Sequence, residues 1–356
     1  MYPLITVDLS KLSHNLNYLC NLCHSNGLTT AIVTKVFCAD NQITELISNS
    51  DADFFADSRL SNLKNCPGNK PKILLRISSP SFIRDVVKYS DISLQSEVHT
   101  IKLLGDAASE LGKKHKIVIM IDLGDLREGI FFDRTDEIYR ACDEVLANKN
   151  LELYGIGTNL TCYGGILPDN KNLGNLVSIA DMIRKKYSIE LPFVSGGNSS
   201  TLEFLKSGGV PKGITNLRLG ESFVLGNDTA VCKVMDGLYG DALTLKAELI
   251  EKKKKPSKPI GTSGKNAFGE EVHFDDHGEM IRGILAIGRQ DMDIEGIHCI
   301  DEKISVIGAS SDHLLVDLSN NNSYNIGDVL EFTMEYGAVL HGFTSSYVDK
   351  EYINKK

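Results

Sequence analysis

The stretch Thr30-Ala31-Ile32-Val33-Thr34-Lys35 decides the interpretation of the fold, because it is a short apolar run that ends in a lysine. A run of this length is typical of a strand buried on both faces in a parallel sheet. A lysine at the carboxyl end of such a strand is costly unless its ammonium is paired or the neutral amine serves as a nucleophile. Taken alone, the stretch favours the simpler interpretation, in which the Lys35 side chain extends into solvent.

Seven further apolar runs follow the same plan, each leading through a polar turn into an amphipathic helical pattern. They cover residues 54–56, 73–77, 92–94, 117–122, 153–157, 193–197 and 216–220. Eight strands alternating with helices over about 200 residues predict a (β/α)8 barrel. A doubly wound open sheet is the structural alternative, but no G-x-G-x-x-G follows the first strand. In a barrel the Lys35 strand would end at the active site, where a desolvated amine can form a Schiff base with an aldehyde.

The pattern changes near residue 235, where alternation with a period of two replaces the helical pattern. The further strand candidates are residues 243–250, 281–287, 304–307, 314–318 and 329–334. They are separated by turn residues, and no helix-length pattern interrupts them. We therefore interpret residues 1–235 as a barrel and residues 236–356 as a smaller all-β domain.

Two local features complete the expected organisation. Residues 5–8 predict a strand, and Ser10 is a plausible N-cap for the helical pattern that follows. The run from Lys252 to Lys255, followed by Pro256, is most simply a solvated loop between strands.

Composition excludes several classes of function. The formal net charge is -9 and there is no long basic run, so nothing indicates a nucleic-acid partner. No stretch approaches the roughly 20 apolar residues that cross a bilayer, and the N-terminal residues do not resemble a signal peptide. We expect a cytoplasmic protein without a membrane partner. Its eight scattered cysteines are then reduced thiols, and its nine histidines lack the spacing of a metal site.

A glycine-bearing loop follows the predicted strand 117–122 and presents Arg127. A guanidinium binds a carboxylate through two parallel hydrogen bonds, which suits the recognition of an amino or keto acid. The alternative is a surface arginine paired with Asp125 or Glu128.

Two later strand ends suggest a site for a phosphate and a ring. Residues 195–201, Ser-Gly-Gly-Asn-Ser-Ser-Thr, open a helix with glycines and hydroxyls that suit a phosphate, although an ordinary capped turn has the same composition. Arg218 ends the next strand beside Gly220. An arginine next to a pyridine nitrogen keeps that nitrogen unprotonated, because two adjacent positive charges are disfavoured. A lysine that binds aldehydes, a phosphate site and two arginines together suggest pyridoxal phosphate (PLP).

The order of these motifs resembles the alanine racemase family of fold-type III PLP enzymes. The motifs are V-x-K, D-x-G-x-x-R, G-N-S before a helix and N-x-R-x-G, followed by a β domain. Within the family, residues 122–129, 159–164, 194–200 and 308–314 look most like those of the ornithine racemases. The resemblance implies a PLP-dependent racemase for L- and D-ornithine, or a related basic amino acid, that works as a head-to-tail homodimer. A PLP-dependent decarboxylase, a D-amino acid lyase and a non-catalytic PLP carrier are the alternatives.

The resemblance also implies roles for individual residues. Lys35 would hold PLP as a Schiff base and then act as the base on one face of the substrate Cα. Arg127 would lie near the phenolic oxygen of PLP and the substrate carboxylate, and Arg218 near the pyridine nitrogen. Further cofactor contacts are implied for Asn198, Ser199, Gly220, Glu221 and Tyr336, and substrate contacts from a second subunit for Ser311 and Asp312. For Tyr336 the alternative is an aromatic residue of a strand in the β-domain core.

Three departures from the family pattern affect these roles. The family has a tyrosine shortly after the PLP lysine, where this chain has Ala39. A carbamylated lysine that supports the carboxylate-binding arginine is replaced by Met120, so Arg127 must be held in another way. The tyrosine that acts on the opposite face of the substrate is replaced by Arg289, and an arginine is a poor proton donor.

The second acid is therefore open among Asp291, Asp312, His313 and Tyr163. A long cationic substrate would also need an acidic residue near its side chain. Glu221, Asp291 and Asp293 are available for that contact, and nothing in the sequence selects among them.

Overall fold

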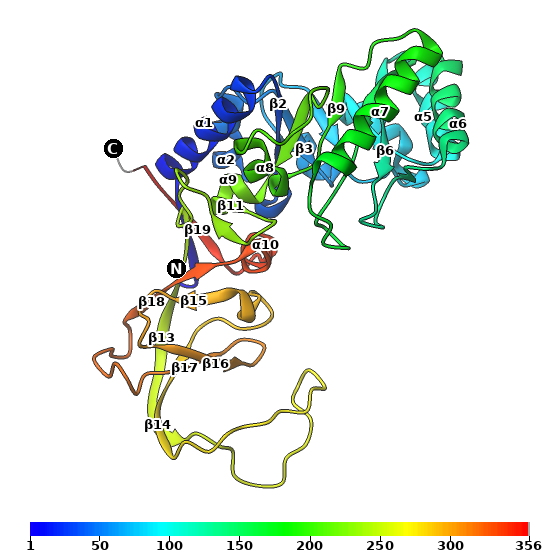
Figure 1. Ribbon diagram of the computed structural model, residues 1–356. Coiled ribbons are helices and arrows are strands. Elements are labelled where there is room, and N and C mark those ends of the chain that lie inside the picture. The colour runs from blue at the N-terminus through cyan, green and yellow to red at the C-terminus, as the bar shows by residue number, and fades with distance from the viewer. Residues whose placement is uncertain (355–356) are drawn as a thin grey trace. The chain divides into compact units, whose positions relative to one another are not determined.

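The computed structural model describes residues 1–354 and divides the chain into two compact units. One unit is formed by Lys11–Gly240, which we call the barrel unit. The other combines Met1–Ser10 with Asp241–Lys356, and we call it the C-terminal unit. Figure 1 shows the strands of the barrel unit with helices such as α1, α5, α6 and α7 on their outside, whereas the C-terminal unit consists mainly of strands.

Eight parallel strands form the closed sheet of the barrel unit. They are β2 (Thr29–Val33), β3 (Phe54–Asp57), β4 (Lys72–Leu74), β5 (Ile92–Gln95), β6 (His115–Asp122), β8 (Leu151–Gly157), β9 (Phe193–Ser195) and β10 (Asn216–Leu219). Each strand pairs in parallel with the next, and β10 pairs with β2 to close the sheet. A two-residue strand, β7 (Ile130–Phe131), pairs with the end of β6. The eight-stranded barrel predicted from the apolar runs is confirmed.

Side chains from these strands fill the barrel, as the continuous apolar runs require. The core cluster consists of Ala31, Phe54, Ala56, Ile73, Ile92, Leu94, Val118, Met120 and Phe193. The rings of Phe54 and Phe193 meet edge to face with their centroids 5.8 Å apart. Gly155 is needed where β8 approaches β9, because a Cβ there would lie 1.7 Å from the carbonyl oxygen of Phe193.

Helices alternate with the strands and bury their apolar faces against the sheet. They are α1 (Leu9–Ser25), α2 (Asn41–Ser48), α3 (Leu60–Asn65), α4 (Ile83–Tyr89), α5 (Val98–Leu111), α6 (Thr135–Ala147), α7 (Asn170–Tyr187), α8 (Leu202–Lys206) and α9 (Glu221–Leu225). Short 3-10 turns are η1 (Lys35–Phe37), η2 (Pro80–Phe82) and η3 (Ser199–Thr201), and β11 (Asn227–Asp228) pairs with β12 (Lys233–Val234). Among residues 1–354, none of the helices combines the length and the apolar character needed to span a bilayer.

The expected N-cap at Ser10 was wrong. Helix α1 begins at Leu9, and the Ser10 N–H donates to Oδ1 of Asp8 at 3.0 Å. Asp8 is therefore the capping residue, because its carboxylate reaches a backbone N–H of the first turn. The Ser10 hydroxyl instead donates to Oδ1 of Asn354 at 2.8 Å.

The C-terminal unit is built on an eight-stranded sheet. Its strands are β1 (Leu4–Asp8), β13 (Leu243–Pro256), β14 (Glu279–Leu285), β15 (Ile297–Cys299), β16 (Ser305–Ala309), β17 (Leu314–Asp317), β18 (Val329–Met334) and β19 (Asp349–Ile353). The 3-10 turn η4 (Ile294–Gly296) and helix α10 (Tyr336–Thr344) complete the unit. The sheet is antiparallel except for the parallel pair β1 and β19, and it agrees with the β domain expected from the period-two alternation.

Two features of this unit differ from the expected domain division. The first ten residues join it, rather than the barrel, because β1 pairs with β13 and with β19. Helix α10 shows that the domain is not all-β. The segment contains two glycines, which lower helix propensity and weaken the sequence signal. Tyr336 is the first residue of α10, so the alternative of a strand aromatic was also wrong.

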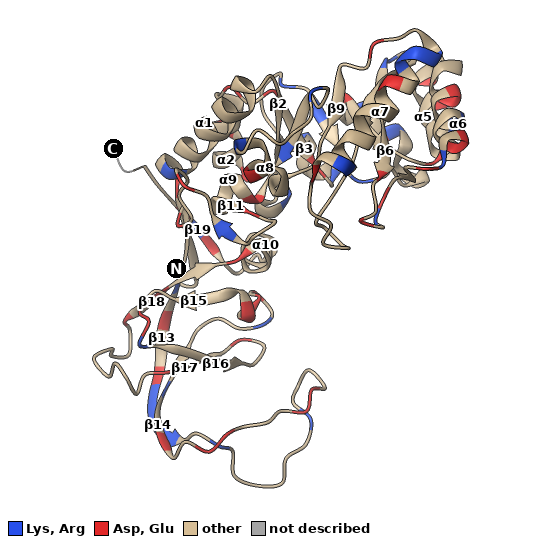
Figure 2. Ribbon diagram, viewed as in Figure 1, with Lys and Arg blue, Asp and Glu red and all other residues tan. Residues whose placement is uncertain are grey.

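The run from Lys252 to Lys255 is not a loop, as expected, but part of β13. Lys252 lies opposite Gly283 and Lys255 opposite Met280 on β14. Acidic partners offset the repulsion between these consecutive lysines, because Lys254 pairs with Glu279 and Lys255 with Glu251. Figure 2 shows basic and acidic residues together along β13. Residues 243–249 of β13 alternate buried and half-buried, as predicted, but none of Lys252 to Lys255 is buried, which explains why the alternation did not reveal this end of the strand.

Candidate active site

The carboxyl ends of the barrel strands carry the residues predicted for a cofactor site. Lys35 follows β2 after Thr34, Arg127 lies in the loop after β6, and Arg218 lies within β10. Asn198 and Ser199 follow β9, and Gly220 and Glu221 follow β10. Since all eight strands run in parallel, these seven residues lie at one end of the barrel, where the chemistry of this fold is found.

Lys35 is half-buried at the start of η1, next to a hydrogen-bonded carboxylate. The Thr34 hydroxyl donates to Oδ2 of Asp57 at 2.6 Å, and the Thr34 N–H donates to the carbonyl oxygen of Ala56 at 2.9 Å. Burial raises the pKa of Asp57, whereas hydrogen bonds from Thr34, Arg59 and Asn62 and the charge of Lys35 lower it. Asp57 is therefore a buried carboxylate in electrostatic contact with Lys35.

The serines after β9 and β10 bring several hydrogen-bonding groups to one place. Ser199 Oγ lies 3.0 Å from Ser222 Oγ and accepts from the N–H groups of Ser222, at 3.2 Å, and Gly220, at 3.5 Å. Ser200 Oγ is buried and has no hydrogen-bond partner among residues 1–354. Hydroxyls and backbone N–H groups that converge in this way suit an anion with several oxygens, such as a phosphate.

Arg218 is buried, with 4% of its surface exposed, and its guanidinium is held by neighbouring strand ends. Nη1 donates to Ser195 Oγ at 2.5 Å, and Nη2 donates to the carbonyl oxygen of Thr158 at 2.6 Å. A longer contact of 3.4 Å joins Nη2 to Oδ1 of Asn159. Burial lowers the pKa of Arg218 to about 10, so it remains a cation at neutral pH.

Arg127 forms a two-point ion pair with Glu128. Nε donates to Oε2 and Nη2 donates to Oε1. The Glu128 side chain is only 18% exposed, and the Asn159 amide donates to its Oε1 at 3.2 Å. Burial opposes the charge of Arg127, but the contact with Glu128 outweighs burial and raises the pKa of Arg127. The pairing with Glu128 named as the alternative is therefore present, with the Glu128 side chain mostly covered and the Arg127 side chain 43% exposed.

Two of the three residues that depart from the family pattern lie in the interior. Ala39 is 2% exposed and has a φ of +51°, and Met120 packs in the barrel core. Met120 therefore belongs to the packing of the strands. Glu128, one residue after Arg127, provides the contact that orients the guanidinium.

Asp125 fixes the loops that surround Arg127. It is 1% exposed, and its carboxylate accepts from the N–H groups of Tyr163 at 2.9 Å, Cys162 at 3.2 Å and Ile166 at 3.2 Å. The loops after β6 and β8 are thereby joined. The Tyr163 side chain is 77% exposed and projects from this junction.

The other predicted site residues belong to the C-terminal unit, and their roles stay predictions. Asp291 is 4% exposed and accepts from Ser345 Oγ at 2.6 Å. His313 Nδ1 lies 2.8 Å from Asp312 Oδ1, and this hydrogen bond lowers the pKa of Asp312. Ser311 Oγ lies 3.4 Å from the same oxygen.

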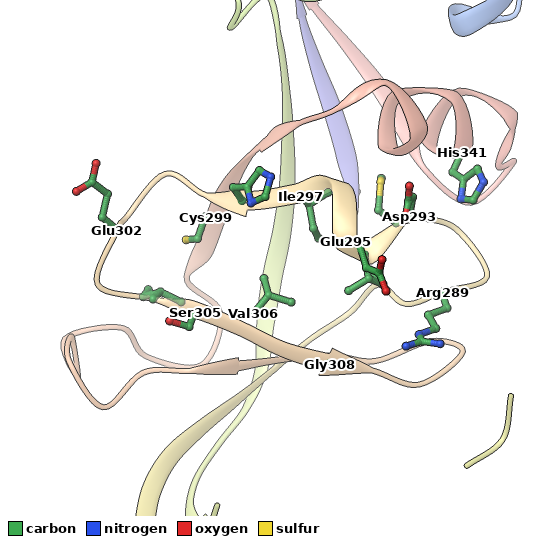
Figure 3. Close-up of a pocket in the computed structure, with 14 residues that line it drawn as sticks. Arg289, Asp293, Glu295, Ile297, Cys299, Glu302, Ser305, Val306, Gly308 and His341 are labelled. Atoms are coloured by element: carbon green, nitrogen blue, oxygen red, sulfur yellow. The ribbon is translucent and has the colours of Figure 1, made fainter. Parts of the chain in front are cut away.

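Within the C-terminal unit, a cavity of about 850 Å³ is lined by 14 residues that include Arg289, Asp293 and Glu295. Figure 3 shows Arg289 and His341 at one end of this cavity and Glu302 at the other. Arg289 donates to both carboxylate oxygens of Glu270, at 3.0 and 2.9 Å. Arg289, which stands where the family has a tyrosine, thus forms an ion pair.

Sequence reasoning did not single out Asp57 or Asn159, and treated Glu128 only as a surface partner. Asp57 and Asn159 both lie at or just beyond the carboxyl ends of barrel strands, β3 and β8. That position was the available signal, because polar residues there face the mouth of a barrel. The partners of Glu128 could not be found in this way, since they depend on the path of a loop.

Comparisons with known proteins agree with the motifs. The family profile described as the alanine racemase N-terminal domain matches residues 7–227. An ornithine racemase from Acetoanaerobium sticklandii is 48% identical over 353 residues, which are 99% of each chain. A lysine racemase from Thermotoga maritima is 34% identical over 355 residues, again 99% of each. The solved structure of an alanine racemase from Clostridium difficile 630 has a TM-score of 0.75 and 16% identity, covering 99% of this chain and 96% of that one.

Proposed function

The chain belongs to the alanine racemase family, and from this premise we propose that it is a PLP-dependent racemase that interconverts L- and D-ornithine. The observation that carries the proposal is the position of Lys35 at the end of β2, at the same end of the barrel as Ser199 and Arg218. The substrate is proposed from the two relatives, which act on ornithine and on lysine and cover this chain almost completely. Both substrates are amino acids with a cationic side chain.

The barrel residues fit the parts of PLP. Ser199, Ser222 and the Gly220 N–H would hold the phosphate, and the buried hydroxyl of Ser200 supplies a further donor. Arg218, fixed by Ser195 and Thr158, would face the pyridine nitrogen. When bound, PLP supplies an electron sink that makes the Cα proton of an amino acid acidic enough to remove.

Lys35 would remove and return the Cα proton on one face of the substrate. Its half-buried position limits its exchange with water, and Thr34 and Asp57 fix the strand end from which it projects. Arg127 would bind the substrate carboxylate and so orient Cα toward Lys35. The proton on the opposite face would come from one of Asp291, Asp312, His313 and Tyr163, with the Asp312 loop supplied by the second subunit of a cytoplasmic homodimer. His313 is oriented by Asp312, as a general acid requires.

The test is a chiral assay of the purified holoenzyme with L-ornithine in D2O. We expect D-ornithine to form with deuterium at Cα, and borohydride reduction to add the mass of the cofactor to the Lys35 peptide. The Lys35→Ala variant should lose both signals. Lys149→Ala, which removes an exposed lysine of the barrel unit, should keep both.

The alternatives make different products. Release of carbon dioxide would indicate a decarboxylase, and loss of the amino group would indicate a lyase. A protein that binds PLP but leaves every amino acid unchanged would be a carrier. Racemisation by Lys35→Ala at the wild-type rate would contradict the proposal.

A further inference from the structure

Glu128 pairs with Arg127 and acts electrostatically on Arg218, the other arginine of the barrel site. It forms the two-point ion pair with Arg127, and among charged groups it contributes most to raising the pKa of the buried Arg218. Its side chain is 18% exposed, so water screens this charge less than at a surface ion pair.

The contact with Glu128 determines which edge of the Arg127 guanidinium can bind a substrate. A guanidinium offers a carboxylate two planar edges, one made by Nε with one terminal nitrogen and the other made by the two terminal nitrogens. Glu128 covers the edge formed by Nε and Nη2. An external carboxylate is therefore directed to the remaining edge, formed by Nη1 and Nη2.

Asn159 fixes Glu128 in turn. Its amide nitrogen donates to Oε1 of Glu128 at 3.2 Å, while its Oδ1 accepts from Nη2 of Arg218 at 3.4 Å and from the Asn198 amide at 3.2 Å. Asn198 also donates to the carbonyl oxygen of Leu160 at 2.9 Å. The orientation of Glu128 is thus tied to residues on β10 and after β9, which are the predicted cofactor contacts.

We propose that Glu128 is the positioning residue for the substrate carboxylate, acting through Arg127 and held by Asn159. The proposal rests on the function proposed above and adds to it a residue with two separable effects. The charge of Glu128 limits the attraction of the site for anions, and its position sets the angle at which Arg127 holds the amino acid. An error in this angle displaces Cα from Lys35 and slows proton transfer.

Two substitutions separate charge from position. Glu128→Gln keeps the size but removes the charge, whereas Glu128→Asp keeps the charge but withdraws the carboxylate by one methylene. We expect Glu128→Gln to lower kcat for both ornithine enantiomers by about tenfold or more, because the guanidinium loses its fixed edge. Its affinity for acetate, measured by NMR titration without turnover, should rise by about threefold, since one competing anion is gone.

Glu128→Asp should lower kcat without raising the affinity for acetate. Its kcat should fall, while its acetate affinity should stay within about twofold of the wild type, because the charge is retained. The matched control is Glu110→Gln, which removes the exposed carboxylate paired with Arg84 on the helices of the same unit. Both measurements should be unchanged in this control.

Each remaining outcome overturns the inference. A wild-type kcat in Glu128→Asp would show that the position of Glu128 does not matter, and an unchanged acetate affinity in Glu128→Gln would show the same for its charge. A variant that is less thermostable but kinetically normal would mean that Glu128 only holds the loop. If Glu128→Gln does not fold, a wild-type kcat in Glu128→Asp is decisive. A wild-type protein that racemises nothing would contradict the proposed function instead.

Discussion

The Thr34 hydroxyl donates a hydrogen bond of 2.6 Å to the buried carboxylate of Asp57, and Lys35 follows Thr34 directly. Asp57 also accepts from the Arg59 N–H at 2.8 Å and from the Asn62 amide at 3.1 Å. Three donors therefore compensate a carboxylate that burial would otherwise keep neutral. The charge of Lys35 lowers the pKa of Asp57 in the same direction as these donors, while burial raises it.

Replacing Thr34 with valine should destabilise the protein more at pH 7 than at pH 4. The change removes one donor from Asp57 and raises its already elevated pKa further. A carboxyl group with a raised pKa in the folded state contributes stability that is present below its unfolded pKa of about 3.9 and is lost as the pH rises through the folded value. We expect a loss of about 1–3 kcal/mol in the free energy of unfolding at pH 7, measured by urea denaturation.

The control for this measurement is Thr344→Val, which removes a hydroxyl that bonds to carbonyls of its own helix. Its effect should be small and independent of pH. An equal loss for Thr34→Val at both pH values would mean that the hydroxyl does not support a charged Asp57.

Replacing Ser199 with alanine should weaken the binding of PLP. Ser199 Oγ is the atom on which the Ser222 hydroxyl and two backbone N–H groups converge. Losing one phosphate contact should raise the dissociation constant of PLP by about tenfold, measured by fluorescence titration of the resolved apoenzyme. Ser207→Ala is the matched control, because the Ser207 hydroxyl bonds to the carbonyl of Phe204 on the outside of the barrel. Equal PLP affinity in the two variants would argue against a phosphate at Ser199.

The barrel could be predicted from the sequence because parallel strands buried on both faces leave continuous apolar runs. Once the strands were placed, their carboxyl ends put Lys35, Ser199 and Arg218 at the same end of the barrel. Contacts between loops leave no comparable pattern in the sequence. Asn159 lies 31 residues from Glu128 and 59 from Arg218, so only the fold reveals that it joins them.

The C-terminal unit was harder to predict for the same reason. The pairing of β1 with β13 joins the first residues of the chain to a strand that begins at Leu243. An apolar strand of five residues does not indicate which sheet it enters. The lysines of β13 were taken for a loop because their pairing depends on partners such as Glu279, on another strand.

His115 should make the protein sensitive to acid. It is fully buried at the start of β6, its Nε2 lies 2.8 Å from Ser93 Oγ, and burial lowers its pKa to about 4. A histidine with a lowered pKa in the folded state contributes stability above its unfolded pKa of about 6.5 and loses it as the pH falls toward the folded value. The shift corresponds to a loss of about 3 kcal/mol between these pH values.

Replacing His115 with glutamine should remove this pH dependence. The free energy of unfolding, measured by urea denaturation between pH 7 and pH 4, should then change less with pH than in the wild type. His99→Gln, which alters an exposed histidine of α5, should leave the wild-type slope unchanged. A slope that His115→Gln does not alter would assign the acid sensitivity to other groups.

Replacing Gly129 with alanine should impair the loop that presents Arg127 and Glu128. Gly129 has a φ of +128°, and a Cβ there would lie 2.6 Å from the backbone nitrogen of Asp122. Gly124, in the same loop, has a φ of +116° but no atom within 4 Å of the corresponding position. Both alanine variants carry the cost of an unfavourable φ, about 1–3 kcal/mol, but only Gly129→Ala must also move the backbone.

We therefore expect the KM for L-ornithine to rise by about tenfold in Gly129→Ala and by less than about threefold in Gly124→Ala, measured at equal fractions of folded protein. Equal KM values would mean that backbone strain alone, rather than the close approach to β6, sets the position of the loop.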